Sequence, residues 1–275
     1  MPKRNKVKTK HKGTLAERAD LLDLYQKSVQ SPQYDIDLFV RWFRKLRGRK
    51  PVILREDFCG TAYTATEWVK GHEKRKAIGV DLDQPTLEWG KKHVLGKEPE
   101  AVQKRVKLIH GNVLDVTKPK ADLTCAMNFS YCVFKTREEL TRYFRAVHKG
   151  LKRDGMFTCE LYGGTEAIVP CKEKRKVGRF QYIWEQAEYN PITNETLCHI
   201  HFRFRDGSKI DRAFTYDWRL WTIPEVKECL LDAGFRLVDV YWEDEDDKGK
   251  GTGTYHVATR EENVLTWLVY FVALK

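Results

Sequence analysis

The sequence predicts an α/β fold in which a mostly parallel sheet of seven strands carries helices on both faces. The first observation is a regular alternation of short apolar segments with longer segments of helical periodicity. The second is that several apolar segments run directly into acids or glycines, as parallel strands do where ligands bind. The expected strands are 52–56, 76–81, 106–110, 121–126, 156–161, 235–242 and 266–274, and the expected helices are 61–70, 84–95, 136–149 and 223–233.

An N-terminal helical cap is expected ahead of this main domain, which we assign to residues 51–275. Residues 14–30 and 34–46 both have apolar side chains at helical spacing. We therefore expect a cap of two helices over residues 13–50, lying over a ligand pocket. Tyr25 in the first helix or Trp42 in the second could touch the ligand, but we expect both to be core residues that pack these helices on the sheet.

An antiparallel β insert is expected after the fifth strand, over residues 163–218. The segments there alternate with period two and are joined by turn residues, among them Asp206-Gly207. Because the insert starts at the carboxyl edge of the sheet, we expect it to form a substrate wall. A ribbon that pairs two copies of the chain is the alternative. The three expected strands are 179–189, 196–205 and 209–216.

The composition is that of a folded cytoplasmic protein. Hydrophobic residues make up 41% of the 275 residues and aromatic residues 12%, which suits a core and argues against disorder. No segment has the roughly 18 apolar residues of a membrane span, and no apolar segment follows the basic N-terminus as in a secretory signal. The seven cysteines lack the spacing of a metal site or a disulfide framework. We expect a cytoplasmic location, no membrane and no metal.

The formal net charge of +11 is concentrated in a basic tail, residues 1–12. This tail holds six lysines and arginines and no acid. Such a tail can bind nucleic acid or anionic surfaces electrostatically, or it can be a solvated flexible terminus that aids solubility. We expect the second, and a small molecule rather than a nucleic acid as the partner; the oligomeric state is not predicted.

The turn after the first expected strand carries the strongest functional signal. It joins an acid, Glu56, to Gly60, and a second strand ends in Asp81 about twenty residues later, a spacing typical of nucleoside binding. A dinucleotide site would need a glycine where Phe58 stands, and Glu56 would repel a pyrophosphate. A cofactor that carries an amino group and a sulfonium would be attracted instead.

These residues resemble the first motif of the class I S-adenosylmethionine-dependent methyltransferases, which have a Rossmann-like fold. A bacterial-type group among them shares the sequence Glu-Asp-Phe-Cys-Gly-Thr-Ala, which this chain has from Glu56 to Ala62. The resemblance covers residues 50–162, and it departs from the family pattern at Phe58, Ala62 and Asn112. It implies S-adenosylmethionine as cofactor and S-adenosylhomocysteine as product. The cofactor-binding residues would be Glu56, Phe58, Cys59, Gly60, Thr61, Ala62, Asp81, Leu82, Asn112, Val113, Asn128 and Phe129.

The resemblance implies methyl transfer to a nitrogen or oxygen atom of a small-molecule acceptor. This in-line displacement depends mainly on alignment, which can supply ~7–11 kcal/mol, so we expect no obvious set of catalytic residues. Arg219 either holds a carboxylate or phosphate, or it pairs with Asp217 or another acid. The substrate candidates are Tyr131, Phe134, Tyr162, Tyr216, Arg219 and Trp221.

Two other functions stay open. The basic tail would suit a methyltransferase that acts on nucleic acid or protein. The departures from the motif would suit a non-catalytic S-adenosylmethionine-binding partner subunit. His199 and His201 could share a metal, although a third ligand at suitable spacing is not apparent. Residues 243–253, an acidic run followed by glycines, are expected to form a loop that does not bind phosphate.

Overall fold

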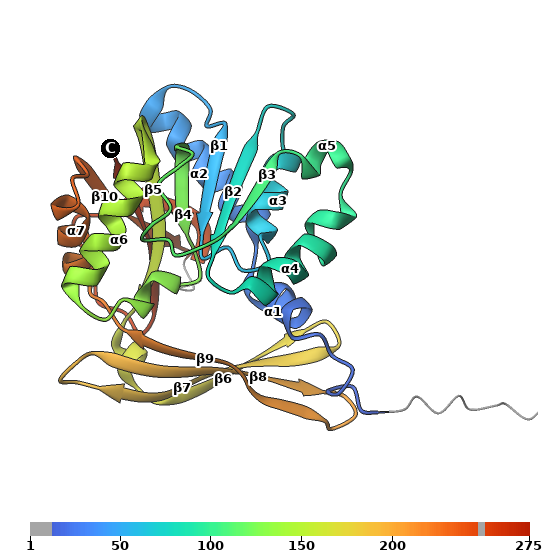
Figure 1. Ribbon diagram of the computed structural model, residues 1–275. Coiled ribbons are helices and arrows are strands. Elements are labelled where there is room, and N and C mark those ends of the chain that lie inside the picture. The colour runs from blue at the N-terminus through green and yellow to red at the C-terminus, as the bar shows by residue number, and fades with distance from the viewer. Residues whose placement is uncertain (1–12, 247–250) are drawn as a thin grey trace, which may run out of the picture.

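The main sheet has eight strands in the order β11-β10-β12-β5-β4-β1-β2-β3 (Figure 1). The computed structural model describes residues 13–246 and 251–275, so the basic tail lies outside the described residues. No helix in these two ranges is long and apolar enough to cross a membrane. The strands are β1 (Ile53–Asp57), β2 (Lys76–Asp81), β3 (Val106–His110), β4 (Ala121–Ala126), β5 (Leu151–Gly163), β10 (Leu237–Glu245), β11 (Gly251–Val257) and β12 (Trp267–Leu274).

The first five strands of this sheet are parallel, and β12, β10 and β11 extend it with antiparallel pairs. β10 and β12, the last two of the predicted strands, pair antiparallel with each other, and the expected number of seven strands is wrong. The additional strand is β11, in which Tyr255 pairs with Glu243 of β10. Part of the predicted loop 243–253 therefore belongs to strands. This edge strand is mostly exposed and rich in glycine and threonine, so it lacks the apolar alternation that marks a half-buried strand.

Helices cover both faces of the main sheet. Buried residues of α2, α3 and α4 form one hydrophobic cluster with the sheet, and α6 and α7 form a second cluster on the other face. Thr136 and Thr222 start α6 and α7 with capping boxes. The helices are α1 (Leu21–Val29), α2 (Pro32–Arg47), α3 (Tyr63–Lys70), α4 (Gln84–His93), α5 (Glu100–Gln103), α6 (Arg137–Gly150) and α7 (Ile223–Asp232), with short 3-10 turns η1 (Leu95–Lys97), η2 (Ser130–Val133) and η3 (Thr165–Ile168).

The two N-terminal helices have different places in the fold. Ile36, Phe39 and Phe43 of α2 recur on one side of this helix and are buried against the main sheet. Only α1 lies at the carboxyl edge, between the two sheets (Figure 1). The expected cap over residues 13–50 is thus corrected: α2 packs in the core of the main domain, where Trp42 is buried as expected, and α1 lies over the carboxyl edge.

A second, antiparallel sheet lies across the carboxyl ends of the parallel strands (Figure 1). It contains four strands rather than the three expected, in the order β6 (Cys171–Val177), β7 (Phe180–Asn190), β8 (Glu195–Phe204) and β9 (Lys209–Arg219). The missed strand, β6, is an edge strand in which three lysines, an arginine and one glutamate are exposed, without apolar alternation. Ile200 and Phe202 on the inner face pack against Leu24 of α1, which ties the insert to the N-terminal helix.

Candidate functional site

The turn after β1 is bonded directly to the end of β2. The backbone N–H of Gly60 donates to Asp81 Oδ2 at 2.7 Å, and the N–H of Cys59 donates to the Val80 carbonyl oxygen at 3.0 Å. Phe58, Gly60 and Ala62 all have positive φ, between 50° and 56°. A left-handed backbone is costly for residues other than glycine, so the turn itself explains why glycines suit these positions. The expected proximity of Gly60 and Asp81 is therefore present in the fold.

Phe58 turns its ring away from the edge of the sheet. The ring centroid lies 5.6 Å from that of Tyr143 and 6.1 Å from that of Phe134, within the cluster beneath α6. The side chains of Cys59, Thr61 and Ala62 are buried as well. This turn therefore presents mainly backbone to a ligand, and a phenylalanine at a glycine position does not fill the space in front of it.

The Cys59 thiol is a packing group. A Cβ atom added to Gly79 would come within 2.8 Å of the Cys59 sulfur, so β2 needs a glycine where it faces this side chain. Burial and the neighbouring carboxylates raise the pKa of Cys59 well above the ordinary value for a thiol. A protonated, buried thiol is a poor nucleophile.

Glu56 and Asp57 are neighbours that serve opposite faces of the sheet. Glu56 is buried and its Oε2 accepts from the N–H of Ala65 in the first turn of α3, at 2.8 Å. Burial raises the pKa of Glu56 to about 8. Asp57 pairs with the buried Arg55 at 2.6 Å and accepts from the Tyr143 hydroxyl at 3.1 Å. Glu56 thus places a carboxyl group behind the turn while it caps a helix.

The predicted cofactor residues that follow β2 and β3 differ in the side-chain surface that they expose to a ligand. Leu82 is 61% exposed although it is apolar, and it directly follows Asp81 at the carboxyl edge. Asn112 uses its side-chain oxygen locally, accepting from the N–H of Leu114 at 3.0 Å. Val113 is buried. Among these three predicted cofactor residues, only Leu82 offers a large apolar surface.

The turn after β4 is strained and is held by a carboxylate that sequence reasoning missed. Asn128 and Phe129 both have a φ of 56°, a conformation that costs of order 1–3 kcal/mol for each such residue. The N–H of Asn128 donates to the carboxylate of Glu160, which is 7% exposed near the end of β5. Burial raises the pKa of Glu160 to about 8. Glu160 lies two residues before Tyr162, a predicted substrate residue, so the period of the strand could have identified it.

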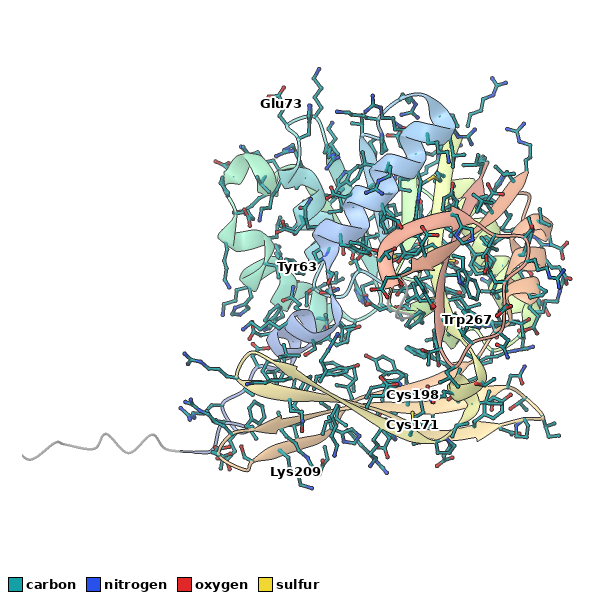
Figure 2. The ribbon with its side chains drawn as sticks, turned by 180° about the vertical axis from the view of Figure 1, so that it is seen from behind. Tyr63, Glu73, Cys171, Cys198, Lys209 and Trp267 are labelled. Carbon is teal, nitrogen blue, oxygen red and sulfur yellow. The ribbon has the colours of Figure 1, made fainter. Side chains whose placement is uncertain are left out.

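A cavity of about 490 Å³ lies where the two sheets face each other. Its walls include Tyr25 of α1, Asn128 after β4, Tyr162 of β5 and Trp184 of β7. Figure 2 shows Trp267 of β12, another lining residue, on the side of the main sheet that faces Cys198 of the second sheet. The side-chain atoms between the sheets therefore leave a space that adjoins the Asn128 turn.

Tyr25 lies close to both halves of the site. Its ring contacts Phe214 of the second sheet, with centroids 5.0 Å apart. Burial raises the pKa of Tyr25 to about 12, and the charges of Glu160 and Asp81 act in the same direction. The hydroxyl is therefore protonated at neutral pH, near the carboxylates of the main sheet.

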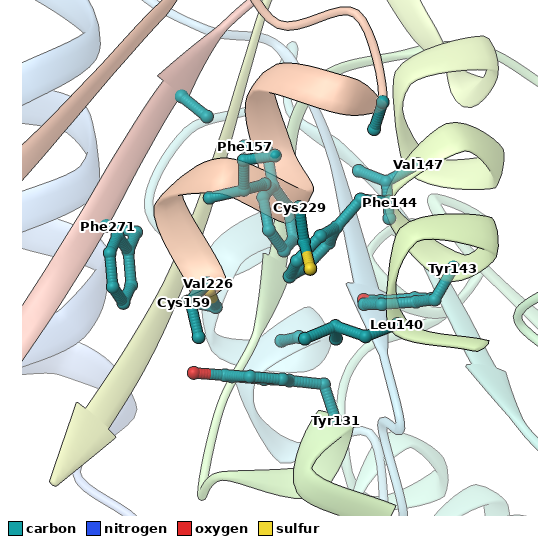
Figure 3. Close-up of a cluster of buried hydrophobic side chains, with 14 of the residues drawn as sticks. Tyr131, Leu140, Tyr143, Phe144, Val147, Phe157, Cys159, Val226, Cys229 and Phe271 are labelled. Atoms are coloured by element: carbon teal, nitrogen blue, oxygen red, sulfur yellow. The ribbon is translucent and has the colours of Figure 1, made fainter. Parts of the chain in front are cut away.

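Two of the six predicted substrate residues line the cavity and four do not. Tyr162 and Tyr216 are lining residues. Tyr131 is fully buried in the core among Leu140, Phe144 and Cys159 (Figure 3), and its hydroxyl donates to the backbone oxygen of Glu160 at 2.9 Å. The 3-10 turn η2 folds this ring back under the sheet, which places it away from the cavity.

Phe134, Arg219 and Trp221 form a separate structural group. The Trp221 Nε1–H donates to the Phe134 carbonyl oxygen at 3.2 Å, and the Arg219 guanidinium lies 3.9 Å from the centre of the Trp221 ring. Arg219 also donates to the Lys135 carbonyl oxygen at 3.0 Å and pairs with Glu225 at 2.7 Å. The alternative in which Arg219 pairs with an acid holds, and that acid is Glu225 rather than Asp217.

Trp184 and Trp218 are cavity residues that sequence reasoning did not select. Trp218 is two residues beyond Tyr216 on β9, and both line the cavity. The period of two along a strand was the signal that could have found it. Trp184 lies on β7, on the same inner face of the second sheet, and no spacing in the sequence relates it to Tyr216.

His199 and His201 lie on the outer face of the second sheet, since they alternate with the inward Ile200 and Phe202. His201 Nε2 lies 2.7 Å from Glu185, and His199 Nδ1 lies 3.0 Å from the Thr215 hydroxyl. Within the described residues, no group of three or more His, Cys, Asp or Glu side chains could hold a metal ion. The two histidines are thus bonded within the sheet and are remote from the cavity.

Comparisons with known proteins give similarity in structure only. No family model matches the chain, and no curated protein matches it in sequence. A methyltransferase of Clostridium acetobutylicum described as S-adenosylmethionine-dependent superimposes with a TM-score of 0.66 at 15% identity, covering 92% of this chain and 96% of that chain. DesVI of Streptomyces venezuelae gives 0.65 at 18% identity, with 93% and 97% covered.

A third similar structure is an amino pentose methyltransferase of Micromonospora echinaspora, solved with S-adenosylmethionine bound. It gives a TM-score of 0.64 at 14% identity, and covers 92% of this chain and 95% of its own. The coverage includes the second sheet as well as the main one, since it spans nearly the whole chain. The chain therefore has the mixed α/β, Rossmann-like fold of these methyltransferases, with a mostly parallel sheet and an added antiparallel sheet.

Proposed function

We propose that this protein is a class I S-adenosylmethionine-dependent methyltransferase that acts on a nitrogen or oxygen atom of a small molecule in the cytoplasm. The observation that carries the proposal is the bond between Gly60 and Asp81 at the carboxyl edge, beside an aromatic cavity of about 490 Å³. The fold shared with methyltransferases supports it. The motif from Glu56 to Ala62 supports a bacterial-type group within that class.

The residues at the edge fit this cofactor. Asp81 would hold the ribose hydroxyls, the exposed Leu82 would contact the adenine, and the backbone at Gly60 would face the cofactor. The pKa values of the buried Glu56 and Glu160 are raised to about 8, and a bound cation such as the amino group or sulfonium of the cofactor would favour the ionised form of these carboxyl groups. When bound, the cofactor supplies a methyl group that is already activated.

The protein's own contribution would be alignment and the exclusion of water. The cavity is bounded by α1 and by the inner face of the second sheet, and these elements limit the acceptor to a small molecule. No general base is required for an acceptor that reacts as a neutral lone pair. The aromatic walls would hold the acceptor beside the Asn128 turn, where the cofactor edge and the cavity meet.

Calorimetry with S-adenosylhomocysteine tests the cofactor site. Asp81→Ala removes a charged hydrogen-bond acceptor, so we expect binding to weaken roughly 10- to 100-fold, equivalent to about 1.5–3 kcal/mol. Asp81→Asn keeps an oxygen for the Gly60 N–H and separates ligand binding from the integrity of the turn. The exposed Asp115→Asn is the control. An absence of heat from folded wild-type protein would refute the proposal.

Labelled cofactor with fractionated cell extract tests the acceptor class. We expect the label to appear in the small-molecule fraction. Label in nucleic acid or protein would instead favour a macromolecular substrate, and deletion of residues 1–12 would then weaken its binding and flatten the salt dependence. Tight cofactor binding without transfer to any fraction would favour a partner subunit that has no catalytic activity.

A further inference from the structure

One wall of the cavity is made of three aromatic rings on two strands of the second sheet. The centroids of Tyr216 and Trp218 are 4.4 Å apart, and Trp184 lies 5.9 Å from Tyr216 and 6.2 Å from Trp218. We call these three residues the aromatic wall. The faces of aromatic rings carry partial negative charge and attract cations, most strongly where water is excluded.

The opposite side of the cavity adds a further ring and a polar group. Phe129 lies 6.2 Å from Trp218 and 4.8 Å from Tyr162 between ring centroids. The Tyr162 hydroxyl is buried and makes no hydrogen bond of ordinary geometry within the described chain. Its polar neighbour is the thiol of Cys198, which is only a weak partner. A ligand in the cavity could satisfy this hydroxyl.

The charged groups around the cavity differ in their exposure to solvent. Arg175 donates to the Ser28 carbonyl oxygen and lies 5.2 Å from the centre of the Tyr182 ring, so its charge is already accommodated. Lys174 is exposed to solvent, as are Glu166 and Glu173. The carboxylate of Glu160 is instead buried, directly behind the Asn128 backbone that lines the cavity. The Asn128 backbone therefore separates the inner end of the cavity from a buried carboxyl group, and charges of both signs lie at the opening of the cavity.

We infer that this cavity binds a small ammonium cation through the aromatic wall of Trp184, Tyr216 and Trp218, with the carboxylate of Glu160 as the nearby counter-charge. That this cation is the methyl acceptor rests on the proposed function. That the cavity binds a cation does not rest on it. For transfer, the ammonium first loses one proton to water. The nitrogen lone pair then forms the new C–N bond as the C–S bond of the sulfonium breaks, leaving a methylated ammonium and a neutral thioether.

A matched pair of probes tests the charge requirement. Choline is a permanent cation, and 3,3-dimethyl-1-butanol has the same shape with carbon in place of the charged nitrogen. We expect choline to bind about 10-fold or more tightly than the alcohol in a calorimetric or fluorescence titration, with and without saturating S-adenosylhomocysteine. Equal or tighter binding of the alcohol would overturn the inference. Choline binding without the cofactor product keeps this result separate from failure of the proposed function.

Variants locate the binding. Trp218→Leu keeps an apolar side chain but removes the π face, so choline binding should weaken about 3- to 30-fold while alcohol binding changes little. Trp218→Phe should restore part of the loss. Trp89→Leu on α4 is the control, because Trp89 bonds to Asp20 and does not line the cavity. Choline binding that is unchanged in Trp218→Leu would place the cation elsewhere and refute the site.

The pH dependence of choline binding tests Glu160. Burial raises the pKa of Glu160 to about 8, so its charge is gained as the pH rises through that value, and choline should bind more tightly from pH 7 to pH 9. Glu160→Gln keeps an acceptor for the Asn128 N–H but should remove this dependence and weaken choline about 10-fold. The alcohol should show no dependence. A pH dependence that persists in Glu160→Gln would assign it to another group and exclude Glu160 as the counter-charge.

Other titratable groups around Glu160 are distinguished by the same variant. Asp35 of α2 has its pKa raised to about 6 by burial, below the tested range. Burial raises the pKa of Tyr25 of α1 to about 12, above that range, and raises the pKa of Tyr270 of β12 well above the ordinary value for a tyrosine. Glu56 of β1 has its pKa raised to about 8 and titrates with Glu160, so only the comparison with Glu160→Gln separates the two.

Discussion

The two sheets of this protein differ in how much of each is covered. All six residues of β4 in the main sheet are buried, because helices pack on both faces. In the second sheet, by contrast, the edge strand β6 is mostly exposed, and α1 and the main domain cover the inner face. The main sheet can therefore hold buried charges in fixed pairs, whereas the second sheet offers one aromatic face to a cavity.

This difference assigns separate tasks to the two sheets in the proposed enzyme. The main sheet presents carboxyl groups and backbone at its edge, which suits a cofactor of constant structure. The second sheet contributes Trp184, Tyr216 and Trp218 to the cavity, which suits a particular acceptor. Substitutions in the main sheet should then affect the stability of the whole fold, and those in the second sheet should act more locally.

The largest expected effect comes from the buried ion pair of the main sheet. Arg55→Leu leaves the buried carboxylate of Asp57 without its partner, which should lower the free energy of unfolding in urea by about 3–5 kcal/mol. Arg55→Leu combined with Asp57→Leu should recover most of the loss. Lys104→Ala breaks the exposed pair with Glu100 and should cost less than about 1 kcal/mol. A comparable loss in the two single variants would contradict this view of the main sheet.

An intermediate effect is expected in the core of the second sheet. Phe202→Ala creates a cavity beside Phe180 and Leu24 and should cost about 3 kcal/mol, at the lower end for such a change because the cluster is small. Hydrogen exchange should accelerate in β7, β8, β9 and α1 while β1 and β4 keep their protection. The exposed Arg203→Ala is the control. Equal acceleration throughout the chain would show that the two sheets unfold together.

The smallest expected effect concerns the outer face of the second sheet. Burial lowers the pKa of His199 in the folded state, so the unfolded chain takes up the proton first as the pH falls below about 6.5. Stability is thus fully present above that pH and is lost below it. Between pH 7 and pH 5, the free energy of unfolding should fall less in His199→Phe than in wild type. The difference between the two decreases should be under about 1.4 kcal/mol, which corresponds to a pKa shift of one unit. Urea titrations at both pH values measure this, with His72→Gln as a control; identical slopes would disprove it.

Most elements of the fold could be predicted from the sequence, and those that could not share a physical reason. The buried parallel strands and the amphipathic helices are predicted from the periodicity of their apolar residues, because burial of one face or of both requires that periodicity. The edge strands β6 and β11 are exposed and polar or glycine-rich, so the sequence carries no burial signal for them.

The candidate site was predictable only where chain order dictates proximity. Gly60 and Asp81 follow neighbouring parallel strands, so their residues had to meet at one edge. Tyr131 and Trp221 also follow strands, but local turns direct their rings into the core. The period of two along β5 relates Glu160 to Tyr162, but only the structure shows that its carboxylate holds the Asn128 turn.

The sequence by itself determined the strands of the parallel core, the acid and glycine at its edge and the presence of an antiparallel insert, because periodicity and chain connectivity constrain these features locally. Only the tertiary structure decided which side chains enter the cavity. Tyr162, Trp184 and Trp218 come from three strands and two sheets, and their meeting depends on how one sheet lies across the other. No spacing in the chain encodes that crossing, since it results from the packing of α1 and the inner face of the insert against the main domain.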